Sequence, residues 1–261
     1  MTGREALAEA ERRLAAAGVE TPRVDAEWLV AHLLGTSRSG LGARLDENVD
    51  GLEPLLVRRE AREPLAYVLA EWGFRRLTLK TDARALVPRP ETETLVERAL
   101  ALAAEIELPR ILDVGVGSGA ISLALKDERP DARVTGVDVS ADALALAREN
   151  AERLGLEVEL RLGDGIEAAG EGWDLVVANP PYVATLDDVQ PELHWEPEVA
   201  LIGEGEHERL ARAARARFLV FEVADGQAQG VAEMLERLGC ADVTVTADLT
   251  GHDRVVAGRL P

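Results

Sequence analysis

The sequence predicts an α/β protein in which a mostly parallel sheet carries helices on both faces, preceded by a small all-helical domain. From Arg110 onward, short apolar segments alternate with helix-length amphipathic ones, and this rhythm is typical of a parallel sheet between two layers of helices. Before Phe74 the apolar residues have helical spacing, with no strand pattern. The length of 261 residues suits one large domain and one small one.

The first part of the chain contains start and stop signals for four helices, and no group of residues in it suggests catalysis. We therefore expect residues 1–72 to form a helical domain that recognises a substrate. The signals are a capping box of Thr2 with Glu5, a stop at Gly18, a start at Thr21-Pro22, a second capping box of Asp50 with Glu53, and a short helix over 65–69.

Residues 73–90 change in character and are expected to link the two domains. Phe74, Leu77 and Leu79 alternate with polar residues, which predicts a β-hairpin or two short strands within 74–87. The third part, residues 91–261, holds the α/β pattern. Strands are expected at 111–114, 133–138, 158–162, 173–178 and 218–223, an antiparallel pair at 243–247 and 254–258, and helices through 95–103 and at 120–126, 141–154 and 227–238.

Composition excludes several classes of function. With 29 basic and 48 acidic residues the formal charge is −19, which disfavours binding to nucleic-acid phosphates and points to a protein or small-molecule substrate. Cys240 is the single cysteine, so an internal disulfide and an iron–sulfur cluster are excluded, and the four histidines lack metal-ligand spacing. No apolar run reaches the ~20 residues that span a bilayer, and the charged start of the chain is no signal segment. We expect a cytoplasmic protein without a metal.

A glycine-rich loop, Asp113–Gly119, follows the first strand of the sheet. Gly115, Gly117 and Gly119 allow positive φ and close approach of a ligand, and ligands of open α/β sheets bind at the carboxyl ends of strands. By itself the loop is also compatible with a structural turn or a dinucleotide site, although the latter prefers the spacing GxGxxG.

Two aspartates end the next two strands. Asp138 lies about 20 residues beyond the glycines, where a carboxylate accepts hydrogen bonds from ribose hydroxyls. A helix-capping role is the alternative, but Ser140 already supplies a cap. Asp164 could contact an adenine edge or be an ordinary loop residue.

The motif Asn179–Tyr182 (Asn-Pro-Pro-Tyr) follows the strand at 173–178. Its prolines fix φ, and Pro180 keeps a carbonyl oxygen. This oxygen and the Asn179 side-chain oxygen can accept both N–H bonds of a planar –NH2 group, while Tyr182 offers a flat face against it. The motif predicts methyl transfer to an amide or amine nitrogen.

With these motifs the chain resembles the PrmC/HemK family of peptide-chain release factor glutamine methyltransferases, which have a seven-stranded, Rossmann-like, S-adenosylmethionine-binding sheet. The likeness extends to Pro64–Tyr67, Val87–Glu93, Glu196-Pro197 and Asp248–Val256. It implies S-adenosylmethionine as cofactor and, as substrate, the glutamine of the Gly-Gly-Gln loop of class I release factors. It also implies roles for individual residues. The cofactor would be bound by Asp113, Gly115, Val116, Gly117, Ser118, Gly119, Asp138, Asp164, Gly165 and Asn179, and the glutamine amide by Asn179, Pro180, Pro181 and Tyr182, with Asn179, Pro180 and Tyr182 acting in catalysis.

Three other functions share part of the pattern. A ribosomal-protein glutamine methyltransferase would use the same chemistry, and a methyltransferase of adenine or guanine amino groups would use the same four residues. The acidic charge disfavours the latter. A nicotinamide-dependent oxidoreductase leaves the Asn-Pro-Pro-Tyr motif without a role.

Overall fold

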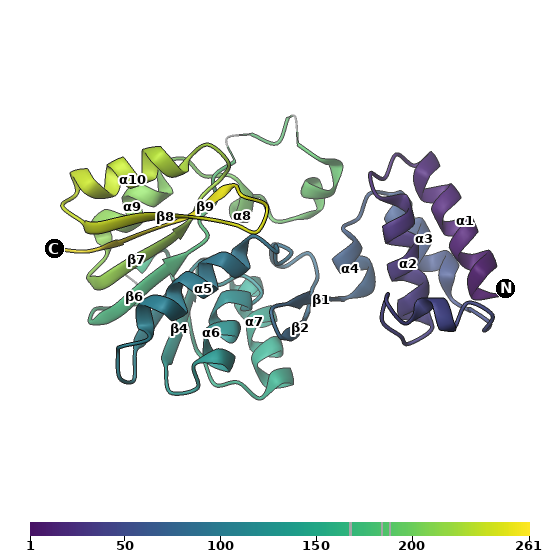
Figure 1. Cartoon of the computed structure of the whole chain (residues 1–261), viewed down its shortest axis with the longest axis horizontal. Helices are drawn as coiled ribbons and strands as arrows, with labels where there is room; N and C mark the ends of the chain where they lie inside the picture. The colour runs from purple at the N-terminus through teal and green to yellow at the C-terminus, as the bar shows by residue number, and fades with distance from the viewer. Residues whose placement is uncertain (167–168, 184, 188) are drawn as a thin grey trace. The chain divides into compact units, whose positions relative to one another are not determined.

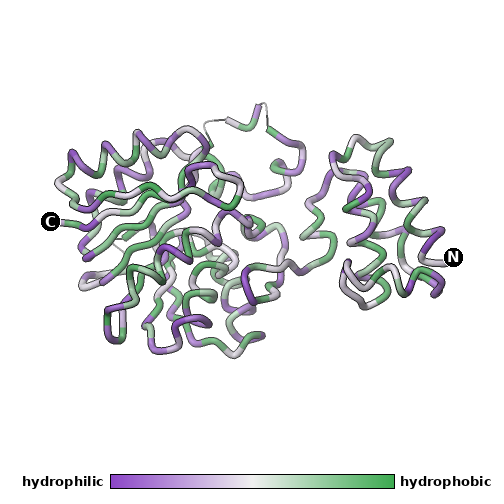
Figure 2. The backbone as a smooth tube through the Cα atoms, viewed as in Figure 1, coloured by the Kyte–Doolittle hydropathy of each residue, from purple (hydrophilic) through white to green (hydrophobic). Residues whose placement is uncertain are grey.

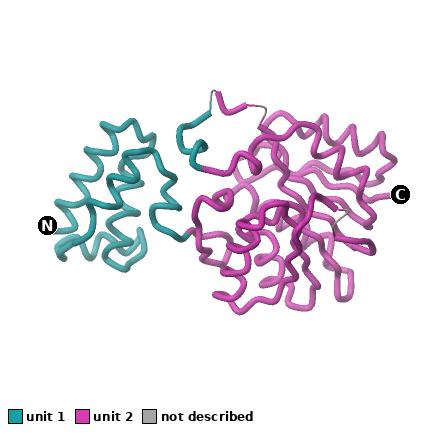
Figure 3. Tube along the Cα trace, turned by 180° about the vertical axis from the view of Figure 1, so that it is seen from behind, with its two compact units in different colours: residues 1–71, 189–195 teal, residues 72–188, 196–261 magenta. Residues whose placement is uncertain are grey.

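The computed structural model describes residues 1–166, 169–183, 185–187 and 189–261. The chain divides into two compact units, which are coloured separately in Figure 3. Unit 1 comprises Met1–Glu71 and Val189–Trp195, and unit 2 comprises Trp72–Asp188 and Glu196–Pro261. Each unit is described by itself.

Unit 1 is helical, as the sequence predicts. The Thr2–Glu5 capping box is confirmed, and Pro22 occupies the first turn of the second helix. The predicted Asp50 cap is wrong: Gly51, with φ of 82°, is the N-cap residue of the third helix and no side chain caps it. A positive φ there suits glycine, and the chain enters the helix without an acceptor side chain. The helices are α1 (Gly3–Ala16), α2 (Pro22–Leu33), the 3-10 turn η1 (Leu41–Ala43), α3 (Leu52–Glu60) and α4 (Leu65–Leu69).

A segment from far along the chain, Val189–Trp195, belongs to unit 1 and contains η3 (Pro191–Trp195). Ion pairs attach it: Glu192 accepts hydrogen bonds from Arg59 and from both Nε and Nη2 of Arg62 at 2.7–2.8 Å. Arg59 also donates to Asp25 at 2.7 Å, and both side chains of this pair are 7% exposed. Nothing in the spacing of apolar residues reveals this assignment of the segment.

Unit 2 contains a seven-stranded sheet in the order β5-β4-β3-β6-β7-β9-β8 (Figure 1). Strands β3 to β7 are parallel, while β9 runs antiparallel to both β7 and β8. The strands are β3 (Arg110–Val114), β4 (Arg133–Asp138), β5 (Glu159–Leu162), β6 (Trp173–Ala178), β7 (Ala216–Glu222), β8 (Ala241–Ala247) and β9 (Asp253–Arg259).

Alternate strand residues supply two separate cores, one on each face of the sheet. Ile111 packs with residues of α5 and α6, whereas the next residue, Leu112, packs with residues of α9 and α10. Figure 2 shows that the central strands are mostly hydrophobic along their length, as expected where helices cover both faces of a sheet. The helices are α5 (Thr92–Ala103), α6 (Ala120–Glu128), α7 (Ala141–Leu154), α8 (Glu198–Leu201), α9 (Glu206–Ala213) and α10 (Ala228–Arg237).

The predicted hairpin is present, but it begins at Glu71, before the expected start at Phe74, and ends at Lys80. Strands β1 (Glu71–Phe74) and β2 (Leu77–Lys80) pair in a two-stranded sheet, and the chain from Thr81 to Pro90 forms neither helix nor strand. Ala85 and Val87 are nevertheless buried, because this stretch packs against the glycine loop and the start of α7.

Candidate active site

The sheet order reverses between β3 and β6, and the loops at the carboxyl ends of β3, β4, β5 and β6 enclose a cavity of about 490 Å³. Such a switch point is where open α/β sheets bind ligands. Of the predicted site residues, the cavity is lined by Gly115, Val116, Gly117, Ser118, Asp138, Asp164, Gly165, Asn179, Pro180 and Pro181. Asp113, Gly119 and Tyr182 do not line it.

The glycine loop and Asp138 are joined by hydrogen bonds. Asp138 Oδ2 accepts from the Gly117 N–H at 2.9 Å, and its Oδ1 accepts from the Ser140 N–H at 2.8 Å. Gly115 has φ of 79°, and a Cβ at this position would meet no atom within 4 Å. The loop is thus open toward the cavity at Gly115, so a ligand can approach the backbone there.

Asp113 and Gly119 do not line the cavity, but their contacts with the first turn of α6 hold the glycine loop in place. Asp113 is fully buried and accepts from the Ser122 N–H (3.1 Å) and hydroxyl (2.7 Å). Burial raises the Asp113 pKa to about 7 despite these bonds. Gly119 is the N-cap of α6 with φ of 89°, and a Cβ there would lie 2.9 Å from Leu123 Cδ1. Both residues fix where the first turn of α6 begins.

Asp164 and Gly165 lie on the rim of the cavity. The Asp164 carboxylate pairs with Arg209 of α9 at 3.1 Å and is 75% exposed. Arg209 pairs more closely with Glu206, at 2.8 Å, and both residues also line the cavity. With only Gly165 after the aspartate, side chains of α9 form this part of the rim.

The Asn-Pro-Pro-Tyr motif directly follows β6, and its first three residues line the cavity. Asn179 Nδ2 lies 3.5 Å from the hydroxyl of Thr92, at the long end of hydrogen-bonding distance. Gly203 packs against the motif, since a Cβ there would lie 2.6 Å from the Pro181 carbonyl oxygen. Burial, followed by the nearby Glu222 carboxylate, raises the Tyr182 pKa, so the phenol stays neutral near pH 7.

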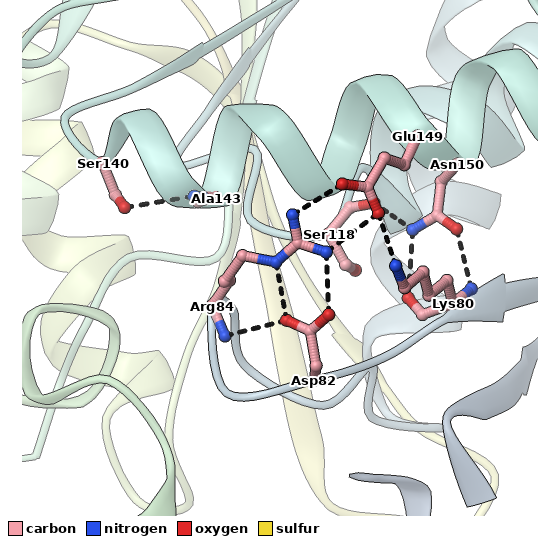
Figure 4. Close-up of polar contacts among 8 residues, drawn as sticks. All are labelled: Lys80, Asp82, Arg84, Ser118, Ser140, Ala143, Glu149 and Asn150. Atoms are coloured by element: carbon pink, nitrogen blue, oxygen red, sulfur yellow. Dashed lines mark hydrogen bonds and ion pairs between the residues drawn. The ribbon is translucent and has the colours of Figure 1, made fainter.

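Residues 84–89, for which the sequence motifs predict no role in the site, form one wall of the cavity. Figure 4 shows how its start is attached to α7: Arg84 pairs with Asp82 and Glu149, each at 2.8 Å. The fully buried Asn150 accepts from the Lys80 N–H at 2.7 Å and donates to the carbonyl oxygen of Ser118 at 2.9 Å. Asn150 therefore joins the end of β2 to the glycine loop. In the sequence, the only signal for this contact is a polar asparagine among the apolar residues of the helix predicted at 141–154.

The far end of the wall rests on a buried carboxylate. Glu196 accepts from the Val87 N–H at 3.0 Å and pairs with Arg89, and its side chain is fully buried. Burial raises the Glu196 pKa, and the Arg89 charge opposes that rise. Glu196 therefore fixes both the backbone of the wall at Val87 and the side chain of Arg89.

Among the residues that the structure describes, no three His, Cys, Asp or Glu side chains are arranged to hold a metal ion. Within the same part of the chain, no helix has the length and apolar character that crossing a membrane requires.

The strand order, the glycine loop at the switch point and the aspartate at the end of β4 define a methyltransferase of the S-adenosylmethionine-dependent class. Residues 92–205 match the model of the methyltransferase small domain, and residues 5–69 match that of the PrmC N-terminal domain. The chain belongs to the release factor glutamine methyltransferase family. A relative of that name from Deinococcus radiodurans is 39% identical over 98% of both chains, and one from Geobacter sulfurreducens is 40% identical over 95% of this chain and 93% of its own.

Solved structures of similar fold extend beyond this family. A methyltransferase from Pyrococcus furiosus has a TM-score of 0.53 and 16% identity, covering 79% of this chain and 96% of its own. The hMettl16 catalytic domain in complex with the MAT2A 3'UTR hairpin 1 has a TM-score of 0.57 and 16% identity, covering 79% and 83%. These likenesses show the fold alone.

Proposed function

We propose that this protein transfers a methyl group from S-adenosylmethionine to the side-chain amide nitrogen of the glutamine in the Gly-Gly-Gln loop of class I release factors. The observation that supports this most strongly is that Asn179, Pro180 and Pro181 line a cofactor-sized cavity, in a chain related to named release factor glutamine methyltransferases along almost its full length.

The residues present fit the cofactor. The cavity volume of about 490 Å³ is in the range for a ligand of this size. Gly115 leaves open space beside the loop backbone, and each Asp138 oxygen that accepts one backbone N–H retains a lone pair for a ribose hydroxyl. S-adenosylmethionine supplies an activated methyl group on a sulfonium sulfur.

The chain's own contribution is to position and enrich the amide nitrogen. A free amide nitrogen is a poor nucleophile because its lone pair is delocalised into the carbonyl. In this proposal the Asn179 side-chain oxygen and the Pro180 carbonyl oxygen accept the two amide N–H bonds, while Tyr182 lies against the planar group. These acceptors orient the nitrogen and increase its electron density as the new bond forms. Methylation makes the nitrogen acidic, so it releases its proton without a strong base.

Recognition of the whole substrate is assigned to charge and to the helical unit. The formal charge of −19 would attract a basic surface around the Gly-Gly-Gln loop, and release factors, which meet ribosomal RNA, are expected to have one. We assign residues 1–72 to substrate recognition, 73–90 to the linker and 91–261 to catalysis. Such a substrate places the enzyme in the cytoplasm, without direct contact to nucleic acid.

The test is intact-mass analysis of a purified class I release factor after incubation with the enzyme and S-adenosylmethionine. We expect a gain of one methyl group, localised by peptide mapping to the Gly-Gly-Gln glutamine and absent when that glutamine is changed to alanine. Ribosomal proteins and RNA are incubated in parallel. Methylation of either of these without methylation of the release factor would refute the proposal and favour the corresponding alternative.

A further inference from the structure

A buried carboxyl group that the proposed reaction does not use lies beside the Asn-Pro-Pro-Tyr motif. Glu222 ends β7, the strand next to β6, and the register pairs Ala178 with Phe221, so Asn179 and Glu222 follow on neighbouring strands. Glu222 is 1% exposed, and its Oε2 has no hydrogen-bond partner. The Thr92 side chain lies close enough to this carboxyl group to lower the Glu222 pKa, although burial outweighs that effect.

Thr92 connects this carboxyl group to Asn179. It is the first residue of α5, is 4% exposed, and has its hydroxyl oxygen 3.5 Å from Asn179 Nδ2. A threonine hydroxyl has one proton to donate and lone pairs to accept. If it donates that proton to the carboxylate of Glu222, it can only accept from Asn179.

This direction matters because the two ends of an asparagine amide have nearly the same shape and opposite hydrogen-bonding character. The glutamine clamp requires the oxygen end of Asn179 to face the cavity. With the nitrogen end toward the cavity, the –NH2 group would meet the substrate –NH2, and donors would face donors. An acceptor-only partner behind Asn179 selects the productive orientation.

We propose that Thr92 and Glu222 are positioning residues that hold the Asn179 side-chain amide with its oxygen toward the cavity, through the chain Asn179 N–H to Thr92 O–H to Glu222 carboxylate. The inference rests on the proposed function, because it deepens the role of Asn179 in that reaction.

The arrangement depends on the protonation state of Glu222. Burial raises the Glu222 pKa to about 7. A protonated Glu222 can donate to Thr92, whose hydroxyl proton is then free to donate to the oxygen end of Asn179, so the unproductive orientation gains stability. The productive orientation is therefore favoured above pH 7 and is lost as pH falls through that value. The ionisable groups facing Glu222 from the packed elements are Arg254 of β9, Arg89 and Glu91 before α5, Tyr182 after β6, and His207 of α9, whose ring contacts the Glu222 backbone oxygen and whose pKa is lowered by burial.

The first test uses the full chain alone and does not require activity. The side-chain amide signals of Asn179 are identified by 15N NMR from their loss in Asn179→Asp, and are followed from pH 5.5 to 8.5. We expect a pH-dependent shift with a midpoint near 7 that is absent in both Thr92→Val and Glu222→Gln. A shift that persists unchanged in both variants would overturn the inference.

The second test measures single-turnover methyl transfer to an intact release factor. Thr92→Val should reduce the rate by ~10-fold or more at pH 8, because Asn179 loses its acceptor, while cofactor affinity stays within twofold. Thr92→Ser should restore the rate. The Glu222→Gln amide can donate to Thr92 as the protonated acid does, so its rate at pH 8 should fall to that of the unaltered enzyme near pH 6 and should no longer change between these two pH values.

A matched control is available in the same sheet. Thr135 of β4 is also 4% exposed and donates to a glutamate, Glu159, at 3.2 Å, but lies away from the motif. Thr135→Val should leave the transfer rate unchanged. Equal rates for Thr92→Val and Thr135→Val would contradict the positioning role. If the unaltered enzyme does not methylate a release factor, the proposed function fails, and the NMR titration still decides the inference.

Discussion

Replacing Asp138 by alanine tests the cofactor site most directly. In the structure the two carboxylate oxygens of Asp138 accept backbone N–H groups of Gly117 and Ser140, at 2.9 and 2.8 Å. We propose that their remaining lone pairs accept both ribose hydroxyls. Asp138→Ala therefore removes the ribose acceptors and also one bond that shapes the glycine loop.

The expected loss follows from these contacts. Hydrogen bonds to a charged group contribute about 1.5–3 kcal/mol each, and water can replace part of that contribution at a half-buried side chain. For two ribose bonds we expect a net loss of about 2–3 kcal/mol, which weakens cofactor binding by about 30- to 150-fold. Asp164→Ala provides the control, since that carboxylate is 75% exposed and already paired with Arg209. Its loss should change the binding free energy by less than about 1 kcal/mol.

Isothermal titration calorimetry with S-adenosylmethionine measures both variants, and circular dichroism confirms that each is folded. A dissociation constant of folded Asp138→Ala within threefold of the unaltered protein would show that this carboxylate does not bind the ribose. A loss for Asp164→Ala as large as for Asp138→Ala would move the site toward β5 and α9.

Three further predictions use other parts of the chain. Asn179→Ala should reduce methyl transfer by ~100-fold or more with little change in cofactor affinity, and activity within a few-fold of normal would contradict the amide clamp. Because Asp113 has a folded-state pKa of about 7, above its unfolded value, its contribution to stability is present below about pH 4 and is lost as pH rises to 7. Urea unfolding should therefore show stability falling over that range by at most about 4 kcal/mol from this group, with a smaller slope in Asp113→Asn. Arg59→Ala leaves Asp25 buried without its cation and should lower the unfolding free energy by about 3 kcal/mol, whereas Arg4→Ala, from an exposed pair, should change it by less than about 1 kcal/mol. Equal losses of unfolding free energy in Arg59→Ala and Arg4→Ala would show that the buried Arg59–Asp25 pair stabilises the fold no more than an exposed pair does.

The parts of the fold that the sequence predicted are those governed by local periodicity and capping. The strands of the sheet lie where apolar runs placed them, and Ser140 caps α7 by accepting from the Ala143 N–H. The third helix differed because a left-handed glycine can begin a helix without a capping side chain. Residues 81–90 also differed, since their burial comes from tertiary contacts and not from pairing in a sheet.

The candidate site was predictable where residues of distinctive chemistry follow strands, as with the glycine loop and Asn179. Glu222 carried no such signal, and Glu196 was part of the family likeness without a role of its own, because a single glutamate in an acidic chain is usually a solvated surface residue. Only the folded chain shows that both are buried beside the cavity wall and the motif. The assignment of Val189–Trp195 to unit 1 likewise depends on long-range ion pairs that no local pattern encodes.

Three buried carboxyl groups have a common role around the cavity. Asp113 holds the start of α6 through Ser122, Glu196 holds the wall through the Val87 N–H, and Glu222 lies beside Thr92 at the start of α5. Burial raises the pKa of all three carboxyl groups, because their charged forms are less well solvated inside the protein than in water.

Apolar residues at these positions would remove that electrostatic cost, but they could not accept hydrogen bonds from loop backbone and hydroxyl groups. The loops around the cavity are not fixed by the backbone hydrogen bonds of a sheet. Hydrogen bonds to the buried carboxyl groups supply directional contacts instead. Because methyl transfer to an amide depends on orientation more than on acid–base strength, such fixed loops suit the proposed reaction. Among the three, protonation of Glu222 is expected to change the orientation of Asn179 without unfolding the sheet, so activity should fall at a higher pH than the one at which acid unfolding begins.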